Sequence, residues 1–357
     1  MSQPWIFYGV DRSHFSAKLR PALRYKQLHH VELTPDMEQI VRRTGVGFVP
    51  VLITPQDETL QDTTEIIDEL EQRCPEPPLL PTAATDRVVC RLFELYADEF
   101  FPMVSMRTRW AYPDNEAELR RAFSAFSGSL ERGNAVADMM SAYLPMLGVT
   151  PETIPAIDAH TDDLLAALCG HFARHSFLLG ERMSLADCAL MGPLYAHLYL
   201  DRVTRRKLYD EAIEVCMWIE RCNRPDPRIM GEWAGGAYSD SLATILDLIG
   251  RDAAPMLLAL EQAFDEWAAG HAQPGMELPR GAGTYRSSLR GAAVTAGVRA
   301  YVPWKMQRLR DCFDALDTPG RENVRAALMP SGCATLLSRR HPGIRLEKRD
   351  FKLVVAR

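Results

Sequence analysis

Two neighbouring stretches decide how the first part of this chain folds: Phe48-Val49-Pro50-Val51-Leu52-Ile53 and Leu60-Gln61-Asp62-Thr63-Thr64-Glu65-Ile66-Ile67. The first stretch is strand-like, and the ring of Pro50 restricts Val49 to extended backbone conformations. The second contains Asp62 and Thr63, residue types that cap helices, before apolar residues spaced to lie on one helical face. Together they predict a strand, a turn and a helix in close succession.

Regular elements are also predicted on the N-terminal side of these stretches. Residues 5–8 are β-prone, residues 14–28 carry apolar side chains at helical spacing, and residues 30–33 form a second predicted strand. A short helix is predicted for residues 37–43. A proline-rich linker follows at 74–81. The predicted order before the linker is therefore β-α-β-α-β-(β)-α.

Beyond the linker the sequence changes to long helical patterns. Helices are predicted at about 84–110, 115–145, 156–175, 184–200 and 209–222, which indicates an all-helical bundle. The chain continues to residue 357, with further helices predicted at 241–248, 255–268 and about 302–316. Residues 281–286 predict a flexible segment, and residues 351–355 predict a terminal strand.

Three motifs occur in an order that resembles the glutathione transferase superfamily. Residues 13–20 resemble the start of the first helix in serine-type members. The stretches 48–52 and 60–67 are similar to the glutathione-binding strand, turn and helix, and residues 177–187 are similar to the signature before a central helix. The resemblance covers about residues 4–230. It implies a thioredoxin-like domain (1–80), an all-helical C-terminal domain (84–230) and a mainly helical extension (231–357).

The resemblance also implies where glutathione binds. Residues Phe48, Val49 and Pro50 form the strand segment, with a cis bond before Pro50 that lets the Val49 backbone pair with the bound peptide as an added strand would. Asp62 and Thr63 begin a helix, whose free N–H groups attract the γ-glutamyl carboxylate. Asp62 is expected to receive the ligand's ammonium or a neighbouring N–H. A bare helix cap is the competing interpretation of these two residues.

The thiolate of glutathione is the nucleophile, and a hydroxyl that donates to the sulfur favours it by lowering the pKa of the thiol. Ser13 has the offset of the catalytic serine in the serine-type members it resembles. Tyr8 is the rival, because tyrosine-type members carry their hydroxyl near the end of the first strand. His14 departs from the family pattern and either shares the chemistry or caps the turn. A site with no side-chain activator remains the third alternative.

Two further motifs are interpreted from helical geometry. A stripe at spacings of three to four residues predicts either core or an electrophile pocket: Tyr96, Phe100, Met103, Arg107 and Trp110. Arg107 and Arg109 would meet an anionic substrate or lie in solvent. Ser184 and Asp187 form a capping box, and this motif predicts a structural role only.

Composition narrows the function classes. Eight cysteines lack the spacing of a zinc site and are expected to be reduced and mostly buried, with no metal bound. No run of 18 apolar residues predicts a membrane span, and the first ten residues do not resemble a secretion signal, so a cytoplasmic location is expected.

From residue 279 onward, the sequence has 16 Lys and Arg residues and 6 Asp and Glu residues. Since apolar residues are interleaved there, the basic tail is expected to dock on an acidic body rather than bind nucleic acid.

The resulting hypothesis is a glutathione-dependent transferase that acts on a small electrophile. The resemblance also implies a homodimer. The alternative is a non-catalytic relative that binds a ligand or a protein through the same scaffold. The extension would wall the substrate pocket, pack on the dimer partner or enlarge the core, and the sequence does not distinguish these roles.

Overall fold

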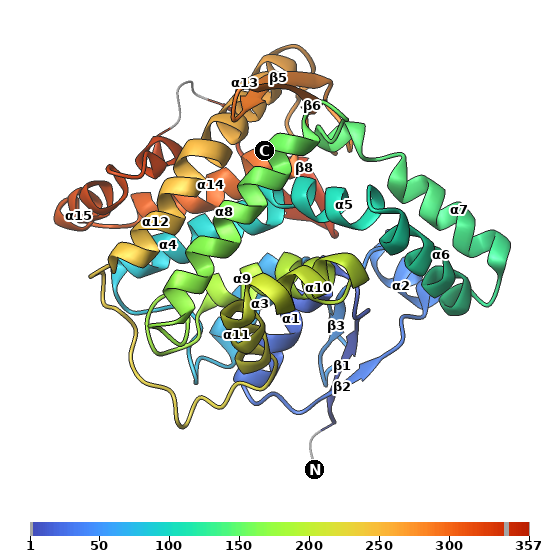
Figure 1. Cartoon of the computed structure of the whole chain (residues 1–357), viewed down its shortest axis with the longest axis horizontal. Helices are drawn as coiled ribbons and strands as arrows, with labels where there is room; N and C mark the ends of the chain where they lie inside the picture. The colour runs from blue at the N-terminus through green and yellow to red at the C-terminus, as the bar shows by residue number, and fades with distance from the viewer. Residues whose placement is uncertain (1–2, 339–342, 357) are drawn as a thin grey trace.

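The structure is a computed structural model that describes residues 3–338 and 343–356. Figure 1 shows the N-terminal region in blue at the bottom of the molecule and the C-terminal extension in orange and red at the top and left. The green and yellow helices of the middle of the chain lie between and beside them. No helix of the described ranges is both long enough and apolar enough to cross a bilayer.

The N-terminal region has the predicted β-α-β-α-β-β-α order: β1 (Trp5–Tyr8), α1 (His14–Tyr25), β2 (His30–Leu33), α2 (Met37–Thr44), β3 (Val51–Ile53), β4 (Thr59–Gln61) and α3 (Thr63–Arg73). The strands form one sheet in the order β2-β1-β3-β4. β1 runs parallel to β2 and antiparallel to β3, and β4 is antiparallel to β3. This arrangement confirms the thioredoxin-like fold of the region.

The two faces of the sheet are covered by different helices. Phe7 and Leu52 point to the face covered by α1 and α3, where they join the main hydrophobic core. Tyr8 and Val51 point to the other face and pack with Ile40 of α2 in a small separate core. Side chains alternate along each strand, and this alternation produces the division.

An all-helical region follows, as predicted: α4 (Ala84–Leu95), the π-helical turn η1 (Tyr96–Phe100), α5 (Pro102–Trp110), α6 (Pro113–Ser127), α7 (Leu130–Ser141), the short 3₁₀ turn η2 (Pro145–Leu147), α8 (Ile154–Phe172), α9 (Leu185–Pro193), the π-helical turn η3 (Leu194–Tyr199), α10 (Arg202–Glu211) and α11 (Ile213–Asn223). The single helix predicted for 115–145 is wrong. Gly128 has a φ of 65°, and this left-handed conformation ends α6 before α7 begins.

The extension is folded along its described residues: α12 (Asp240–Leu248), the π-helical turn η4 (Ile249–Ala253), α13 (Ala254–His271), β5 (Thr284–Leu289), β6 (Ala292–Gly297), α14 (Tyr301–Asp314), α15 (Thr318–Leu328), the 3₁₀ turn η5 (Cys333–Leu337), β7 (Leu346–Arg349) and β8 (Lys352–Val355). The predicted helices and the terminal strand are confirmed. The flexible segment predicted at 281–286 is wrong, because Thr284 to Leu289 pair with residues 292–297 in an antiparallel hairpin.

The extension packs against the helical region rather than apart from it. α12 lies along α8, while α14 and α15 lie along α4. The main hydrophobic core continues from the N-terminal region through these helices into the extension. The extension therefore enlarges a shared core, which is one of the three roles that the sequence left open.

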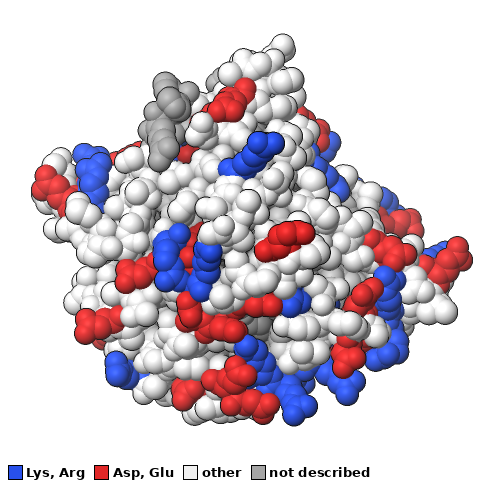
Figure 2. Space-filling view, turned by 45° about the horizontal axis from the view of Figure 1, so that its top comes forward, with Lys and Arg blue, Asp and Glu red and all other residues white. Residues whose placement is uncertain are grey.

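The basic extension also pairs with acidic residues of the preceding chain, as expected. Arg290 lies 2.7 Å from Asp163, and the ammonium of Lys305 lies 2.7 Å from Asp98. On the face shown in Figure 2, basic and acidic side chains are interspersed. The excess positive charge of the extension is thus partly neutralised by contacts within the chain.

Candidate functional site

The strand register brings the three predicted site segments to one edge of the sheet. Tyr8 at the end of β1 pairs with Val51 at the start of β3, and Val51 pairs with Gln61 at the end of β4. Ser13 follows β1, Val49 precedes β3, and the helix that begins after Asp62 follows β4. Segments that are distant in sequence therefore meet at the edge formed by these three strand ends.

Ser13 is the N-cap of α1. Its Oγ accepts a hydrogen bond from the backbone N–H of Ser16 at 3.3 Å. The half-buried hydroxyl donates to no other group in the described part of the chain. A hydroxyl that caps a helix in this way keeps its own proton available, and it lies at the positive end of the helix dipole.

Tyr8, the rival for the thiol, is placed differently. Its side chain is buried on the α2 face of the sheet, and its hydroxyl donates a 2.6 Å hydrogen bond to the side-chain oxygen of Gln39. The proton that would stabilise a thiolate is therefore already bonded within the protein.

His14 is buried at the contact between α1 and α9. A side-chain carbon at Gly192 would lie 2.8 Å from the His14 ring, so glycine allows the helices to approach. The imidazole Nε2 lies 4.0 Å from a carboxylate oxygen of Asp98, and neither atom has a hydrogen-bond partner among the described residues. Burial lowers the pKa of His14 to about 4, although Asp98 acts in the opposite direction. His14 is therefore neutral near pH 7 and packs behind the helix start, whereas Ser13 provides the cap.

The Val49–Pro50 peptide bond is cis, as the resemblance implies. No described residue forms a hydrogen bond with the backbone N–H or C=O of half-buried Val49. The neighbouring Phe48 side chain is 51% exposed, with the guanidinium of Arg280 4.8 Å from its ring centre. The Phe48 carbonyl accepts a 3.0 Å hydrogen bond from the Gln61 side chain, which ties this loop to β4.

Asp62 and Thr63 form the start of α3. Asp62 has a φ of 78°, an uncommon value for a residue with a side chain, and its carboxylate caps the helix by accepting from the Thr64 N–H at 3.0 Å. The Thr63 side chain is buried, and within residues 3–338 and 343–356 its hydroxyl has no hydrogen-bond partner. The structure thus confirms Asp62 as a helix cap, and the binding role of Asp62 and Thr63 stays a prediction.

Beneath this helix start lies a buried charge cluster that the sequence interpretation missed. The Lys18 ammonium lies 2.7 Å from Glu94 and 2.6 Å from Asp98, and Thr64 donates to Glu94 at 2.7 Å. Lys305 of α14 contacts both Thr64 and Asp98. The cluster joins α1, α3, α4 with its π-helical turn, and the extension.

The positively and negatively charged side chains of this cluster stabilise one another. Burial by itself would raise the pKa of Asp98 and Glu94, but Lys18 and Lys305 lower both below their ordinary values. Burial would likewise lower the pKa of Lys305, but Asp98 and Glu94 raise it. The sequence did contain a signal for this cluster, because Lys18 interrupts the apolar face of its helix and Glu94 and Asp98 are four residues apart.

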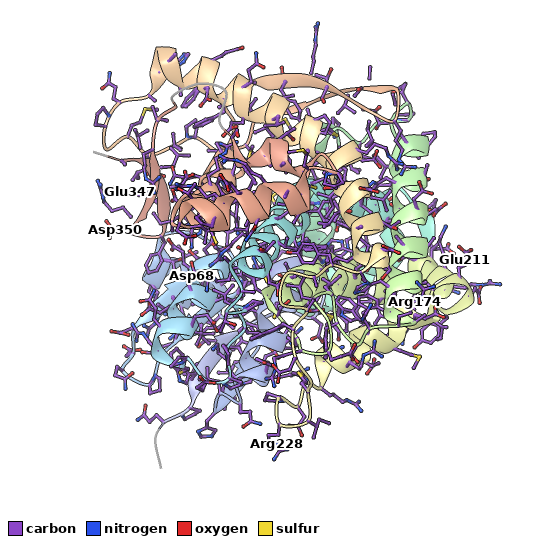
Figure 3. All side chains as sticks on the ribbon, turned by 90° about the vertical axis from the view of Figure 1, so that its left-hand side faces the viewer. Asp68, Arg174, Glu211, Arg228, Glu347 and Asp350 are labelled. Carbon is purple, nitrogen blue, oxygen red and sulfur yellow. The ribbon has the colours of Figure 1, made fainter. Side chains whose placement is uncertain are left out.

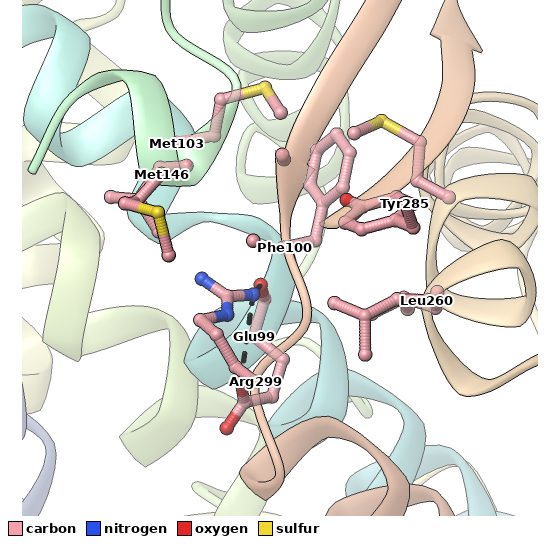
Figure 4. A pocket seen from close by; sticks show the side chains of 12 residues that line it. Glu99, Phe100, Met103, Met146, Leu260, Tyr285 and Arg299 are labelled. Atoms are coloured by element: carbon pink, nitrogen blue, oxygen red, sulfur yellow. Dashed lines mark hydrogen bonds and ion pairs between the residues drawn. The ribbon is translucent and has the colours of Figure 1, made fainter. Parts of the chain in front are cut away.

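The aromatic stripe of the first helix of the bundle is core. Tyr96 donates to or accepts from the His160 ring at 2.8 Å, and Trp110 stacks on Phe123. Phe100 and Met103 line a small pocket closed by the extension (Figure 4). The cavity has a volume of about 20 Å³, which is enough for one water molecule.

Glu99 and Arg299 face one another at this pocket, with 3.7 Å between the nearest charged atoms (Figure 4). Burial raises the pKa of Glu99 to about 7, while Arg299 acts to lower it. The two arginines expected to meet a substrate or lie in solvent are buried and paired within the chain, so the solvent interpretation is wrong. Arg107 pairs with Asp158, and Arg109 pairs with buried Asp201 at 2.9 Å.

The capping box before α9 is confirmed. Asp187 accepts from the Ser184 N–H at 2.9 Å, and its carboxylate also accepts from the Leu178 N–H and the indole of Trp218. Five of the eight free cysteines are buried, as expected. Across the described residues no group of three or more His, Cys, Asp or Glu side chains is placed to hold a metal ion.

Two family models match the chain. The glutathione S-transferase N-terminal domain matches residues 7–78, and the glutathione S-transferase C-terminal domain matches residues 136–226. No curated protein matches the chain.

Solved structures also resemble this fold. A glutathione S-transferase of Rhodospirillum rubrum F11 has 22% identity over 62% of this chain and 90% of its own, with a TM-score of 0.42. The β-etherase LigF of Sphingobium sp. strain SYK-6 has 18% identity over 64% and 97%, with a TM-score of 0.46. A glutathione S-transferase of Methylobacterium radiotolerans in complex with glutathione sulfonate has 18% identity over 67% and 99%, with a TM-score of 0.39.

The two matched domains follow one another in the order of the thioredoxin-like region and the helical region. They support a glutathione transferase-like function. The chain belongs to the glutathione transferase superfamily.

Proposed function

We propose that this chain is a glutathione-dependent transferase that conjugates or otherwise transforms a small electrophile through an activated glutathione thiolate. The observation that carries the proposal is the convergence, at one sheet edge, of hydrogen-bonding groups that have no partner among the described residues. These groups are the Ser13 hydroxyl proton, the backbone of Val49 and the polar groups of Thr63 at the start of α3. Each has a counterpart in glutathione, which acts as co-substrate.

Ser13 donates to the glutathione sulfur in this proposal. The hydroxyl and the positive end of α1 both favour the thiolate, and they lower a thiol pKa that is otherwise about 8.5. Val49 pairs with the cysteinyl backbone, and Phe48 and Pro50 flank it. Because the α3 N-terminus attracts anions, Thr63 binds the γ-glutamyl carboxylate while Asp62 receives the ammonium.

Calorimetric titration with glutathione tests this assignment. We expect Thr63→Ala to weaken binding about tenfold, because one hydrogen bond to a charged group is lost. Ser13→Ala should bind glutathione within about twofold of wild type but conjugate chlorodinitrobenzene about 100-fold more slowly. Ser129→Ala is the matched control, since Ser129 caps α7 with the same 3.3 Å geometry away from the sheet edge. Failure of the wild-type protein to bind millimolar glutathione would contradict the proposal.

One observation favours the alternative of a non-catalytic ligand- or protein-binding relative. The pocket beside Phe100 and Met103, where the stripe left an electrophile pocket as one expectation, has room for about one water. The larger hollow of about 530 Å³ beside Arg12 and Glu118 is lined chiefly by charged side chains. Glutathione binding without turnover of any electrophile in a broad screen would support this second function.

The homodimer stays a prediction from the resemblance, and the cytoplasmic location stays a prediction from the sequence. Light scattering on the purified protein tests the first, and fractionation of the source cells tests the second.

A further inference from the structure

Residues of the C-terminal extension converge on the start and side of α3. Lys348 of β7 lies 3.7 Å from the Asp62 carboxylate, and Lys305 of α14 contacts Thr64. Arg308 of α14 pairs with Asp68 one helical turn further on. Figure 3 shows Asp68 where the extension meets the N-terminal region, with Glu347 of β7 above it at the same side of the molecule.

The ammonium of Lys348 is held in place by the extension itself. It donates to the Tyr301 hydroxyl at 2.7 Å and to the Phe351 carbonyl at 3.3 Å. It also lies 4.9 Å from the ring centre of Tyr301 and 5.8 Å from that of Trp304. The side chain is only 6% exposed. An ammonium has three N–H donors, so one is left without a hydrogen-bonded acceptor in the described residues.

The Asp62 carboxylate lies near this remaining donor but beyond hydrogen-bond distance. At 3.7 Å the two charges attract one another without forming a direct bond. One Asp62 oxygen already caps α3 by accepting from Thr64. A fixed cation, a fixed anion and a helix N-terminus thus lie together at the end of β4.

This arrangement is complementary to an α-amino acid. The γ-glutamyl end of glutathione carries an ammonium and a carboxylate on the same carbon atom. We propose that Lys348, positioned by Tyr301, binds this α-carboxylate while Asp62 binds the ammonium, so that the extension completes the glutathione site. The inference rests on the proposed function and adds to it a residue more than 280 positions after the predicted site in the sequence.

The assignment gives the extension a role in recognition. The carboxylate would lie between the cation of Lys348 and the first N–H groups of α3, both of which favour negative charge. A peptide without the α-carboxylate would leave the third N–H of the nearly buried Lys348 ammonium without a hydrogen-bonded acceptor among the described residues. Such a peptide should bind more weakly for that reason.

A cycle of two proteins and two peptides tests the inference by calorimetry. The peptides are glutathione and 4-aminobutyryl-Cys-Gly, which lacks only the α-carboxylate. We expect wild type to prefer glutathione about 100-fold, because Thr63 and Lys348 both bind the carboxylate. Lys348→Met should lose about tenfold of that preference by weakening glutathione binding alone. Lys352→Met is the matched control, because Lys352 lies on the same hairpin and pairs with Glu277 at the surface.

The outcomes separate the inference from the function on which it rests. If wild type binds neither peptide, the proposed function and the inference both fail. If wild type binds glutathione and Lys348→Met binds it equally well, the inference alone is overturned. If Lys348→Met weakens the binding of both peptides equally, the inference is also overturned, because the role of Lys348 would then be structural. Should Lys348→Met unfold, Lys348→Gln removes the charge while keeping a donor for Tyr301, and it should lose the same preference.

Discussion

The starts of α9 and α3 both place an aspartate carboxylate on backbone N–H groups, and they differ in how completely that carboxylate is satisfied. At α9, Asp187 is fully buried and accepts from Ser184, Leu178 and Trp218. At α3, Asp62 accepts from Thr64 and faces Lys348 without a direct bond. The first carboxylate is saturated within the protein, whereas the second is not.

The difference teaches how a structural cap is distinguished from a binding site. Both sequences look like helix caps, because capping depends only on local residue types. A saturated buried network rigidifies the fold and has no donor or acceptor left for a ligand. An incompletely satisfied helix start beside fixed charges has that capacity, and the predictions below test the contrast from the largest effect to the smallest.

Asp187→Ala should cost the most stability. The change leaves the Leu178 N–H and the Trp218 indole without acceptors in the core, and we expect a loss of about 4 kcal/mol in the free energy of unfolding. Urea denaturation followed by circular dichroism measures it. Asp226→Ala, at a carboxylate paired locally with Arg228 near the surface, is the control with little expected effect. A loss below about 1 kcal/mol would remove the basis of the comparison.

Lys305→Met tests the charge cluster behind α3. The variant leaves Asp98 and Glu94 with Lys18 as their nearest ammonium, and we expect a loss of about 3 kcal/mol in the free energy of unfolding. Lys207→Met is matched to it, because Lys207 pairs with Asp162 at the surface and should change stability by less than about 1 kcal/mol. Equal effects in the two variants would show that burial does not distinguish the cluster.

Glu99 follows Asp98 of this cluster in the sequence, and Glu99→Gln tests it through the pH dependence of the free energy of unfolding. Because burial raises its pKa to about 7, folded Glu99 holds a proton between about pH 4.5 and 7 that the unfolded chain has released. Its contribution to stability is therefore complete below about pH 4.5 and lost as pH rises through about 7. As the pH is raised from 5 to 8, we expect the free energy of unfolding of Glu99→Gln to increase by about 2 kcal/mol relative to that of wild type.

The contribution of His14 has the opposite sign and cancels in that difference. Its pKa is lowered to about 4, so stability is lost as pH falls from about 6.5 through about 4 in both proteins. If the difference in the free energy of unfolding between wild type and Glu99→Gln does not change with pH, Glu99 does not titrate with a raised pKa in the folded protein, and the prediction is wrong. Thermal unfolding at a series of pH values provides the measurement.

Most of the N-terminal fold and the capping box could be predicted because their signals are local. Alternating and helical periodicity predicted the strands and helices, and Ser184 with Asp187 predicted a capping box with a structural role. Ser13, Phe48, Val49, Pro50, Asp62 and Thr63 were predicted as the site, and their roles stay predictions that the titrations test. The break at Gly128 was missed, because a helical pattern continues on both sides of one glycine.

The sequence by itself determined which segments become strands, helices and caps, since these depend on neighbouring residues. Only the tertiary structure decided how the extension meets the site. Lys305 and Asp98 are 207 positions apart, and the contact of Lys348 with Asp62 spans still more of the chain. No local periodicity encodes such pairs. They form because the shared core places α14 and the C-terminal hairpin beside α3, where buried charges require partners of the opposite sign.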